Sequence, residues 1–407
     1  MSNLLNNKIF YTIIVLLSII KFLYSFYFGD IELVDEWSIL YENLVNSNGY
    51  SYYEINGQKL PSAYMPPLYA YFLYIFSYLD LTEFYTVKFI LTSQCIFSFF
   101  SVIIFYKLLL NFFEKKTSYF VSIIYFIYPL NFYASSQISS VTLQVFLFLL
   151  FCFYFIKLSS LSDYILLGII AGLSILIRGE FWLLFFLLIF LKLIIKKLNL
   201  KKIFISIIMI CLIISPQIVY NYNIFQKIVI TQSSGYNLWR GNSEIPNING
   251  ETYPDNKLKI KIEKLKNELI SKKDLNNYEI YLDKIYLDKA VTNIANDPYK
   301  YLKHYIYKFF SFAFFNLKSN YPGYYNPLSI LPEILISVFA IAGIVINIIS
   351  KKRNDEILFI TIYYLGLIPV FFVLPRYKLF ILPMYFIFAT YFFAFLSEKN
   401  FFKKAIK

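Results

Sequence analysis

The chain has 407 residues, a formal net charge of +13 and a mean hydropathy of +0.58. Because 58% of its residues are hydrophobic and only 15% are charged, against roughly 45–50% and 25% in soluble domains, the composition excludes a soluble globular protein. The single His304 excludes a histidine-rich metal centre, and the three cysteines lie in apolar runs, where a thiol is usually a packing group.

Apolar runs of about 20 residues, the length a helix needs to cross a bilayer, recur along the chain. The sequence therefore predicts an all-α polytopic membrane protein with about ten transmembrane helices, and no nucleic-acid partner. The first run is too long for the core of a signal peptide and no small-residue cleavage site follows it, so we expect it to stay as an anchor. The expected spans are residues 9–28, 85–111, 118–134, 141–157, 163–178, 181–198, 203–220, 328–349, 356–374 and 377–396.

Four short basic loops set the expected orientation, because positively charged short loops stay in the cytoplasm. Placing all four inside puts both termini inside as well. The apolar stretch 66–81 is short for a span, and counting it as one would move Lys115 and Lys116 to the outside. We therefore predict that it lies in the outer interface, with its aromatic side chains at headgroup level. The basic loops are Glu114–Lys116, Lys192–Lys202, Lys351–Arg353 and Lys399–Lys407.

Two segments are then expected outside the membrane. The first, from Gly29 to Met65, holds six acids and one lysine, and the second, from Asn221 to about Tyr325, is the long polar region. Apolar residues at helical spacing predict that the second segment is mainly helical. The expected domains are a transmembrane core at 1–220 that includes a catalytic first outer loop at 29–84, an extracytoplasmic helical domain at 221–326, and C-terminal transmembrane helices at 327–407.

Four acids, Asp30, Glu32, Asp35 and Glu36, arrive within seven residues directly after the first apolar run, in a chain where acid is the scarcer charge. One explanation is structural. The stretch VDEWSILYENL has the pattern of a helix start, and the helix dipole favours acids in the first turn. The acids could also be solvated or pair with outer lysines. The alternative is a catalytic role, which the neighbouring motifs favour.

The sequence around these acids resembles the first outer loop of GT-C glycosyltransferases. The resemblance is to the bacterial branch similar to dolichyl-phosphate-mannose–protein mannosyltransferases, which includes aminoarabinose-transferase-like proteins. In that loop an Asp-Glu pair follows the first span, a helix ends in a Gly-Tyr turn, and a Pro-Pro-Leu-Tyr element opens an interfacial helix. The stretches at 172–186, 215–242 and 374–389 resemble later parts of the family in order. The matching first-loop residues are Asp35-Glu36, Gly49-Tyr50 and Tyr64-Met65-Pro66-Pro67-Leu68-Tyr69.

This resemblance implies an inverting glycosyltransferase of the bacterial inner membrane, with an extracytoplasmic active site. It would move a sugar from a polyprenyl-phosphate donor to a hydroxyl of a glycolipid, lipopolysaccharide or protein acceptor. Asp35 would be the base that takes the acceptor proton, assisted by Glu36. A Mg²⁺ or Mn²⁺ ion on this pair and on phosphate oxygens is compatible with the residues, but nothing in the sequence requires it. The substrate cavity that the resemblance implies contains Tyr64, Pro66, Pro67, Tyr69 and Tyr377.

The arginines give a second, independent signal. The chain has only four, and three of them, Arg178, Arg240 and Arg376, fall on the expected outer side, where topology does not require positive charge. A guanidinium binds phosphate oxygens through two parallel hydrogen bonds, which lysine cannot reproduce. We therefore predict that Arg240 and Arg376, with Arg178 as a third, bind the donor phosphate. The alternative is that these side chains reach lipid headgroups or pair with outer acids.

Two other functions stay open at this point. A flippase or secondary transporter would also be polytopic, but such proteins usually show internal repeats and ionisable residues in mid-membrane, and this sequence shows no repeat. A polyprenyl-linked glycan polymerase would also have a large outer loop, but without an Asp-Glu pair directly after the first span. The position of the first-loop helix relative to Arg240 and Arg376 distinguishes both from a transferase.

Overall fold

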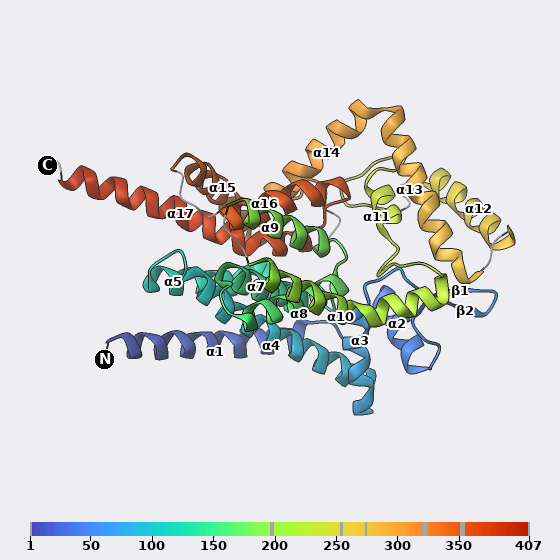
Figure 1. Cartoon of the computed structure of the whole chain (residues 1–407), viewed down its shortest axis with the longest axis horizontal. Helices are drawn as coiled ribbons and strands as arrows, with labels where there is room; N and C mark the ends of the chain where they lie inside the picture. The colour runs from blue at the N-terminus through green and yellow to red at the C-terminus, as the bar shows by residue number, and fades with distance from the viewer. Residues whose placement is uncertain are drawn as a thin grey trace.

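The computed structural model of the chain describes residues 2–195, 199–252, 255–272, 275–319, 324–350 and 355–405. The long helices lie side by side with both termini at one end of the molecule, and a group of polar helices covers the other end (Figure 1). The helices are α1 (Ser2–Phe28), α2 (Asp35–Val45), α3 (Pro67–Ile75), α4 (Glu83–Leu109), α5 (Lys115–Ile127), α6 (Pro129–Ser135), α7 (Val141–Lys157), α8 (Leu161–Ile177), α9 (Phe181–Ile195), α10 (Leu200–Phe225), α11 (Ser234–Gly241), α12 (Asn256–Lys272), α13 (Tyr278–Asn296), α14 (Pro298–Ala313), α15 (Pro327–Ile349), α16 (Asp355–Leu367) and α17 (Lys378–Ala405).

Five described helices are long and apolar enough to cross a membrane, and they correspond to five of the ten expected spans. Shorter apolar helices, α7, α8 and α9 among them, pack beside these five. The expectation of a helical membrane protein is therefore confirmed, whereas the number ten stays a prediction. The five long helices are Lys8–Phe28, Glu83–Leu109, Leu200–Phe225, Pro327–Ile349 and Pro375–Ser397.

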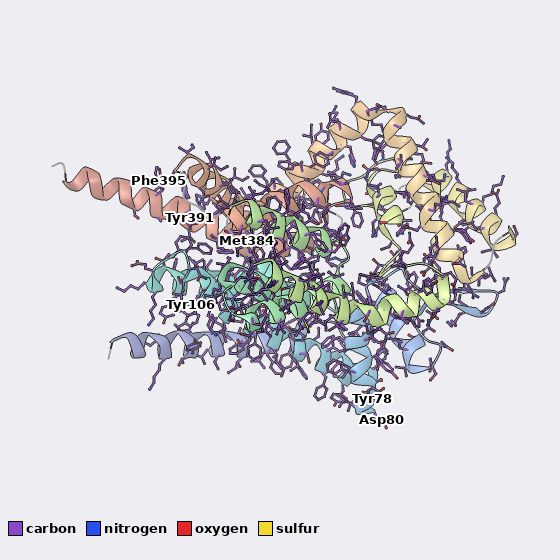
Figure 2. The ribbon with its side chains drawn as sticks, in the orientation of Figure 1. Tyr78, Asp80, Tyr106, Met384, Tyr391 and Phe395 are labelled. Atoms are coloured by element: carbon purple, nitrogen blue, oxygen red, sulfur yellow. The ribbon has the colours of Figure 1, made fainter. Side chains whose placement is uncertain are left out.

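Close helix contacts hold the bundle together. α15 packs along α17, and at Gly343 an added Cβ would lie 1.8 Å from the carbonyl oxygen of Phe388. Small residues allow the backbones of membrane helices to approach this closely. α17 supplies much of the buried centre, from Leu379 to Ala389, and Figure 2 shows Met384 inside the bundle.

A proline interrupts the span expected at residues 118–134. α5 ends at Ile127 and α6 begins at Pro129. Tyr128, between them, has a ψ of 130°, which is the extended backbone that a following proline imposes. The expected single helix is therefore two short ones.

The span expected at 356–374 is also shorter than predicted. α16 ends at Leu367, and the 3₁₀ helix η3 (Ile368–Val370), which contains Pro369, takes its place. Parts of the expected basic loops, residues 196–198 and 351–354, lie outside the described residues, as does the end of the tail at 406–407.

A two-stranded hairpin in the first loop is an addition to the all-α prediction. Strand β1 (Ser51–Ile55) pairs antiparallel with β2 (Gln58–Pro61). The turn between them is Asn56-Gly57, and both residues have positive φ, 52° and 79°. Asn-Gly between two short strands is the strongest short-range hairpin signal in a sequence. The hairpin was thus predictable.

The stretch that was expected in the interface forms α3 and then the 3₁₀ helix η1 (Phe76–Leu79). At 1.5 Å per residue, its 13 residues reach only about 20 Å, short of the roughly 30 Å of a hydrocarbon core. It ends at Asp80 in a left-handed turn, and Figure 2 shows Tyr78 and Asp80 at the edge of the molecule. This length favours the interfacial placement, which stays a prediction.

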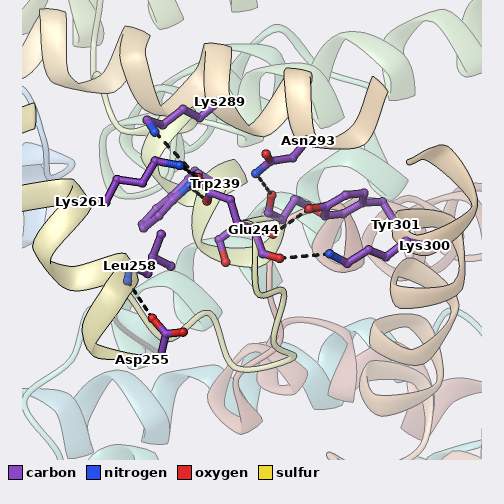
Figure 3. Close-up of polar contacts among 11 residues, drawn as sticks. Trp239, Glu244, Asp255, Leu258, Lys261, Lys289, Asn293, Lys300 and Tyr301 are labelled. Atoms are coloured by element: carbon purple, nitrogen blue, oxygen red, sulfur yellow. Dashed lines mark hydrogen bonds and ion pairs between the residues drawn. The ribbon is translucent and has the colours of Figure 1, made fainter. Parts of the chain in front are cut away.

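The polar helices α11 to α14 form what we call the cap, residues 234–313. Their packing centres on the turn that follows α11 (Figure 3). The Glu244 carboxylate lies 3.1 Å from the ammonium of Lys261 on α12 and 3.8 Å from that of Lys289 on α13. From α14, Lys300 donates to the Glu244 carbonyl and Tyr301 to the Ser243 carbonyl. One turn therefore ties three helices together.

Candidate functional site

A cavity of about 580 Å³ lies where the bundle meets the cap. Segments distant in the sequence form its walls: the start of α2, the loop before α3, the α8–α9 turn, the 228–240 region and the 367–377 region. Several apolar and aromatic side chains line it, but its charge is concentrated in a few groups. The charged lining residues are Glu36, Arg178, Glu180, Arg240 and Arg376.

Arg178 belongs to the bundle wall, directly after the last turn of α8. Its Nε lies 2.5 Å from a carboxylate oxygen of Glu180. Its guanidinium also lies over the rings of Tyr377 and Phe380, at 4.9 and 4.6 Å from their centres. Stacking and ion pairing of this kind hold a guanidinium in one orientation. The charge of Arg178 is therefore largely balanced within the wall.

Arg240 belongs to the cap wall, in the last turn of α11. Its Nε donates to the carbonyl of Gly250 at 2.6 Å, and its guanidinium lies 4.3 Å from the centre of the Phe372 ring. Gly250 has a φ of +69°, a conformation that glycine adopts without strain. Within the described residues, the two terminal nitrogens of Arg240 make no hydrogen bond.

Arg376 reaches the same cavity from the short 3₁₀ helix η4 (Pro375–Tyr377) at the start of α17. Although 136 positions separate it from Arg240, direct contacts fix α11 against the segment before η4. Asn242 donates to the carbonyl of Val370 at 2.9 Å. A Cβ on Gly241 would lie 1.7 Å from the carbonyl oxygen of Phe371, so only glycine permits this approach.

Lys308 of α14 holds the same junction together. Its side chain is fully buried, and its ammonium donates to the carbonyls of Gly241 at 3.1 Å and Phe371 at 2.7 Å. It also reaches the side-chain oxygen of Asn242 at 3.2 Å. A buried ammonium must have its hydrogen bonds satisfied. Lys308 therefore links the helix of Arg240 to the segment that leads to Arg376.

The acid pair opens α2 at the edge of this cavity. Glu36 is half-buried and lines the cavity, whereas Asp35 is exposed and is not among the lining residues. Asp35 has a φ of +53°, a left-handed backbone that is uncommon outside glycine and that concentrates at functional sites. Neither carboxylate has a hydrogen-bond partner in the part of the chain that the structure describes.

Two stacked tyrosines lie between the acid pair and Arg240. Burial raises the pKa of Tyr52 to about 12, and the charges of Glu36 and then Asp35 add to this. Burial also raises the pKa of Tyr64, with Arg240 opposing the rise and Glu36 contributing to it. The two rings stack, with their centres 5.1 Å apart. Tyr64 is therefore the side chain whose pKa responds to the charges of both Glu36 and Arg240.

Comparisons with known proteins identify the fold. No protein-family model matches the chain, and no curated protein matches it in sequence. The apo crystal structure of the oligosaccharyltransferase of Archaeoglobus fulgidus matches with a TM-score of 0.52 at 11% identity, over 98% of this chain and 51% of that one. The fold is that of the GT-C glycosyltransferases. This confirms the resemblance at the level of fold, and the chain spans about half the length of that oligosaccharyltransferase.

Structures of ArnT from Cupriavidus metallidurans also match at 11% identity. The apo form has a TM-score of 0.43 and covers 95% of this chain and 77% of that one. The form bound to undecaprenyl phosphate has a TM-score of 0.42 and covers 94% of this chain and 76% of that one.

Within this GT-C fold, Tyr64, Pro66 and Tyr377 line the cavity as expected, but Pro67 and Tyr69 do not. Tyr69 points the other way, into the core, where its hydroxyl donates to Gln94 at 3.1 Å. Its ring packs edge-on against Trp37, a lining residue. Tyr69 therefore supports the cavity wall from behind. The physical reason is that α3 begins at Pro67 and turns its following side chains away from the cavity.

Sequence reasoning missed Glu180, Trp37 and Trp182 as cavity residues. A signal existed for Glu180, because it follows one of only four arginines by two positions in the stretch RGEFW. No such signal marks the tryptophans, because their place in the wall depends on how the helices pack.

The described residues contain no group of three or more His, Cys, Asp or Glu side chains that could hold a metal ion. Asp35 and Glu36 would supply at most two protein ligands, whereas Ca²⁺ and Mg²⁺ take six or more ligands in all. The donor set does not form a dedicated metal site. The site is therefore described by its carboxylates, arginines and tyrosines.

Proposed function

We propose that this protein is an inverting glycosyltransferase that moves a sugar from a polyprenyl-phosphate donor to an acceptor hydroxyl. The observation that carries this proposal is the convergence of three of the chain's four arginines, from three distant segments, on one cavity that also contains Glu36. A cavity of this charge at the end of a GT-C membrane bundle suits an anionic lipid headgroup. The acceptor would be a glycolipid, lipopolysaccharide or protein.

The donor phosphate would bind mainly to Arg240 and Arg376. Arg178 is already paired with Glu180, so these two acid–base partners largely cancel. The charged lining groups, three arginines against Glu36 and Glu180, leave the cavity with a net positive charge that a phosphate would balance. Apolar lining residues such as Ile218 and Ile228 suit the adjoining prenyl chain.

The chemistry needs one base and no general acid, because a lipid phosphate is already a good leaving group. The base takes the proton of the acceptor hydroxyl as its oxygen attacks the anomeric carbon. The bond from that carbon to the phosphate oxygen breaks, and its electron pair passes to the phosphate. Arginines placed at that oxygen stabilise the developing charge. A single displacement of this kind inverts the anomeric configuration.

Asp35 is our candidate base, with Glu36 orienting the acceptor. The left-handed backbone of Asp35 supports this choice, because such strain concentrates at functional positions. Glu36 is the rival candidate, since it lines the cavity. Comparing Asp35→Asn with Glu36→Gln decides between them, because only loss of the base removes the chemical step while donor binding persists.

The reaction is tested with the purified full chain in proteoliposomes that contain a panel of polyprenyl-phosphate sugars. We expect release of polyprenyl phosphate and a product of inverted configuration, detected by mass spectrometry and NMR. Lys303→Ala, at an exposed position of α14, is the matched control for surface charge. If no polyprenyl-phosphate sugar binds or reacts, and envelope glycans of a strain lacking the protein are unchanged, the proposal is wrong.

Location is tested separately. We propose that the protein resides in the bacterial inner membrane with its cavity on the extracytoplasmic side, as the basic loops predict. A cysteine at Asn48 should react with an impermeant maleimide in intact cells, and a cysteine at Lys116 should react only after lysis. Labelling of the Lys116 position from outside would contradict both the orientation and the interfacial placement of 66–81.

A further inference from the structure

Helix α13 of the cap carries two buried acids that the proposed reaction does not use. Glu279 and Asp283 lie one turn apart on the same face, and they are 5% and 3% exposed. Neither lines the large cavity. Burying a carboxylate is unfavourable unless hydrogen bonds compensate for the lost water. The hydrogen-bond partners of Glu279 and Asp283 therefore indicate the role of these two acids.

Glu279 holds the first loop. One of its carboxylate oxygens accepts from the hydroxyl of Ser62 at 2.7 Å, and the other accepts from the backbone N–H of Ala63 at 2.6 Å. The N–H of Tyr64 donates in turn to the Ser62 hydroxyl oxygen at 3.1 Å. The residues fixed in this way directly precede Tyr64 and Pro66 in the cavity wall.

Asp283 holds the segment of Arg240. One of its carboxylate oxygens accepts from the side-chain amide of Gln232 at 2.7 Å, and the other accepts from the backbone N–H of Tyr236 at 2.8 Å. Tyr236 lies one helical turn before Arg240 on α11. The helix that presents the guanidinium is therefore fixed at its start by Asp283.

A further hydrogen bond closes the circuit. The backbone N–H of Gln232 donates to the carbonyl of Ala63 at 2.7 Å, which joins the two held segments directly. The path runs from Ala63 to Glu279, along α13 to Asp283, across to Gln232 and back to Ala63. Every link except the α13 turn is a hydrogen bond of 2.6–2.7 Å.

We propose that Glu279 and Asp283 are positioning residues that lock the Tyr64 loop and the Arg240 helix into one unit and so set the spacing between acceptor-side and phosphate-side groups. The catalytic meaning of the lock rests on the proposed function, whereas its physical existence does not. The lock predicts that the cap fixes the geometry of the cavity through two acids that do not contact the donor.

The energetics of Glu279 agree with a positioning role. Burial raises its pKa from 4.5 to about 7, its hydrogen bonds to Ser62 and the loop backbone oppose the rise, and Asp283 adds to it. Because the folded-state pKa lies above the unfolded value, ionised Glu279 lowers the free energy of unfolding above pH 7, and this penalty is relieved as the pH falls. Ionisation of Glu279 therefore costs stability, and its hydrogen bonds to Ser62 and the loop backbone offset part of that cost.

The same pKa predicts a pH dependence for the lock. Ionised Glu279 accepts both loop hydrogen bonds, so the lock is complete above about pH 7 and weakens as the carboxylate is protonated below it. The groups that face Glu279 from the packed elements are Asp283 of α13, Tyr50, Tyr52 and Tyr53 of the hairpin region, Tyr64 of the loop and Tyr236 of α11. Burial raises the pKa values of Tyr50, Tyr52, Tyr53 and Tyr64, which moves their titration further from this range, and Asp283 adds to the rise in the pKa of Glu279.

The first test does not depend on activity. Hydrogen–deuterium exchange of the full chain in nanodiscs, corrected for intrinsic rates, should show faster exchange around Ala63 in Glu279→Gln and around Tyr236 in Asp283→Asn. We expect about a tenfold increase for the loss of one charge-assisted hydrogen bond. Glu268→Gln, an exposed acid on α12, should change neither region. Unchanged exchange in both cavity-facing segments would overturn the lock.

The second test asks whether the lock serves the reaction. We expect the Michaelis constant for the donor to rise about tenfold in Glu279→Gln with a smaller change in kcat, because misplaced binding groups weaken donor binding. The fall in donor affinity of the wild type below pH 7 should disappear in this variant. If Glu279→Gln does not fold, Ser62→Ala removes one donor to the same carboxylate.

The outcomes separate the two proposals. If Glu279→Gln exchanges faster but keeps the Michaelis constant and pH profile of the wild type, the lock exists but does not position groups for the reaction. That result would overturn the positioning role. Faster exchange in a protein that uses no polyprenyl-phosphate donor would overturn the proposed function and leave the lock standing. The double variant should change donor use by less than the product of the single variants, because both acids belong to one circuit.

Discussion

Each wall of the cavity contains an arginine, but the two arginines have different partners. In the bundle wall, Arg178 is paired with Glu180 and stacked on two aromatic rings. In the cap wall, Arg240 also lies over an aromatic ring, that of Phe372, but its Nε donates to a backbone carbonyl and its terminal nitrogens make no hydrogen bond within the described residues. One guanidinium is balanced inside its wall, and the other is presented to the cavity.

This difference shows that an arginine in a cavity wall does not necessarily contribute to the binding of an anionic ligand. A paired guanidinium gains little from a second anion, because its Coulombic attraction is already satisfied. An arginine held through a neutral carbonyl keeps its full charge. We therefore expect Arg240 of the cap to contribute more to donor binding than Arg178 of the bundle, with the acid pair of α2 between them.

The largest expected effect is on turnover, and it should leave donor binding by the two walls unchanged. Asp35→Asn keeps the side-chain shape and removes the proposed base, so turnover should fall by about 10²-fold or more. Binding of a polyprenyl phosphate, measured by quenching of tryptophan fluorescence, should be unchanged, because no arginine is altered. Glu36→Gln should be milder. Turnover of Asp35→Asn within a few-fold of the wild type would assign the base elsewhere.

A large effect on stability is expected where the cap joins the bundle. Lys308→Met keeps the length of the side chain but leaves the carbonyls of Gly241 and Phe371 without their donor. Leaving buried polar groups unsatisfied should lower the free energy of unfolding by about 3 kcal/mol. Thermal unfolding in detergent measures this. Lys303→Met, five residues earlier on α14 and exposed, is the control and should unfold like the wild type.

Arg240→Lys sharpens the comparison between the walls directly. Lysine keeps the charge but loses both the Nε bond to Gly250 and the two-pronged contact with phosphate. Affinity for polyprenyl phosphate should fall about 10- to 100-fold. The same change at Arg178 should have a much smaller effect. Equal losses of affinity in the two variants would contradict the distinction between the walls. Unchanged affinity in Arg240→Lys would mean that Arg240 acts by charge attraction alone.

The sequence predicted the parts of this molecule that depend on composition and local pattern. The apolar helices follow from the long apolar runs, and the GT-C fold was implied by the family resemblance of motifs that occur in order along the chain. The Asn56-Gly57 hairpin was readable too, but the dominant helical signal concealed it. What the sequence could not predict depends on tertiary packing. Tyr69 lies in the same motif as Pro66 yet faces the core, because the direction of a side chain on a short helix is set by its neighbours.

The acids of the cap show the same limit more clearly. Glu279 and Asp283 sit in a helix with many charges, and nothing local distinguishes them from exposed acids such as Asp288. Their burial depends on partners that are distant in the sequence. Glu279 and its partner Ser62 are more than 200 positions apart, and Asp283 and its partner Gln232 are 51 positions apart. Such long-range pairs leave no periodic signature in a single sequence.

The smallest expected effect has the opposite sign from the others. Glu180→Gln removes the carboxylate that balances Arg178 and leaves its guanidinium stacked on Tyr377 and Phe380. The cavity then gains one net positive charge, and affinity for polyprenyl phosphate should rise by about two- to fivefold, since an interaction of this kind near a protein surface is worth about 1 kcal/mol after screening.

The same measurement at low and high salt checks the cause of this gain. An added charge that acts through Coulombic attraction should lose part of its advantage as the ionic strength rises from 0.05 to about 0.5 M, because the screening length falls to a few ångströms. Glu268→Gln makes the same change in net charge at an exposed cap position and should leave affinity unchanged. Weaker binding in Glu180→Gln would mean that the ion pair orients Arg178 for the donor, and Arg178 would then take part in binding.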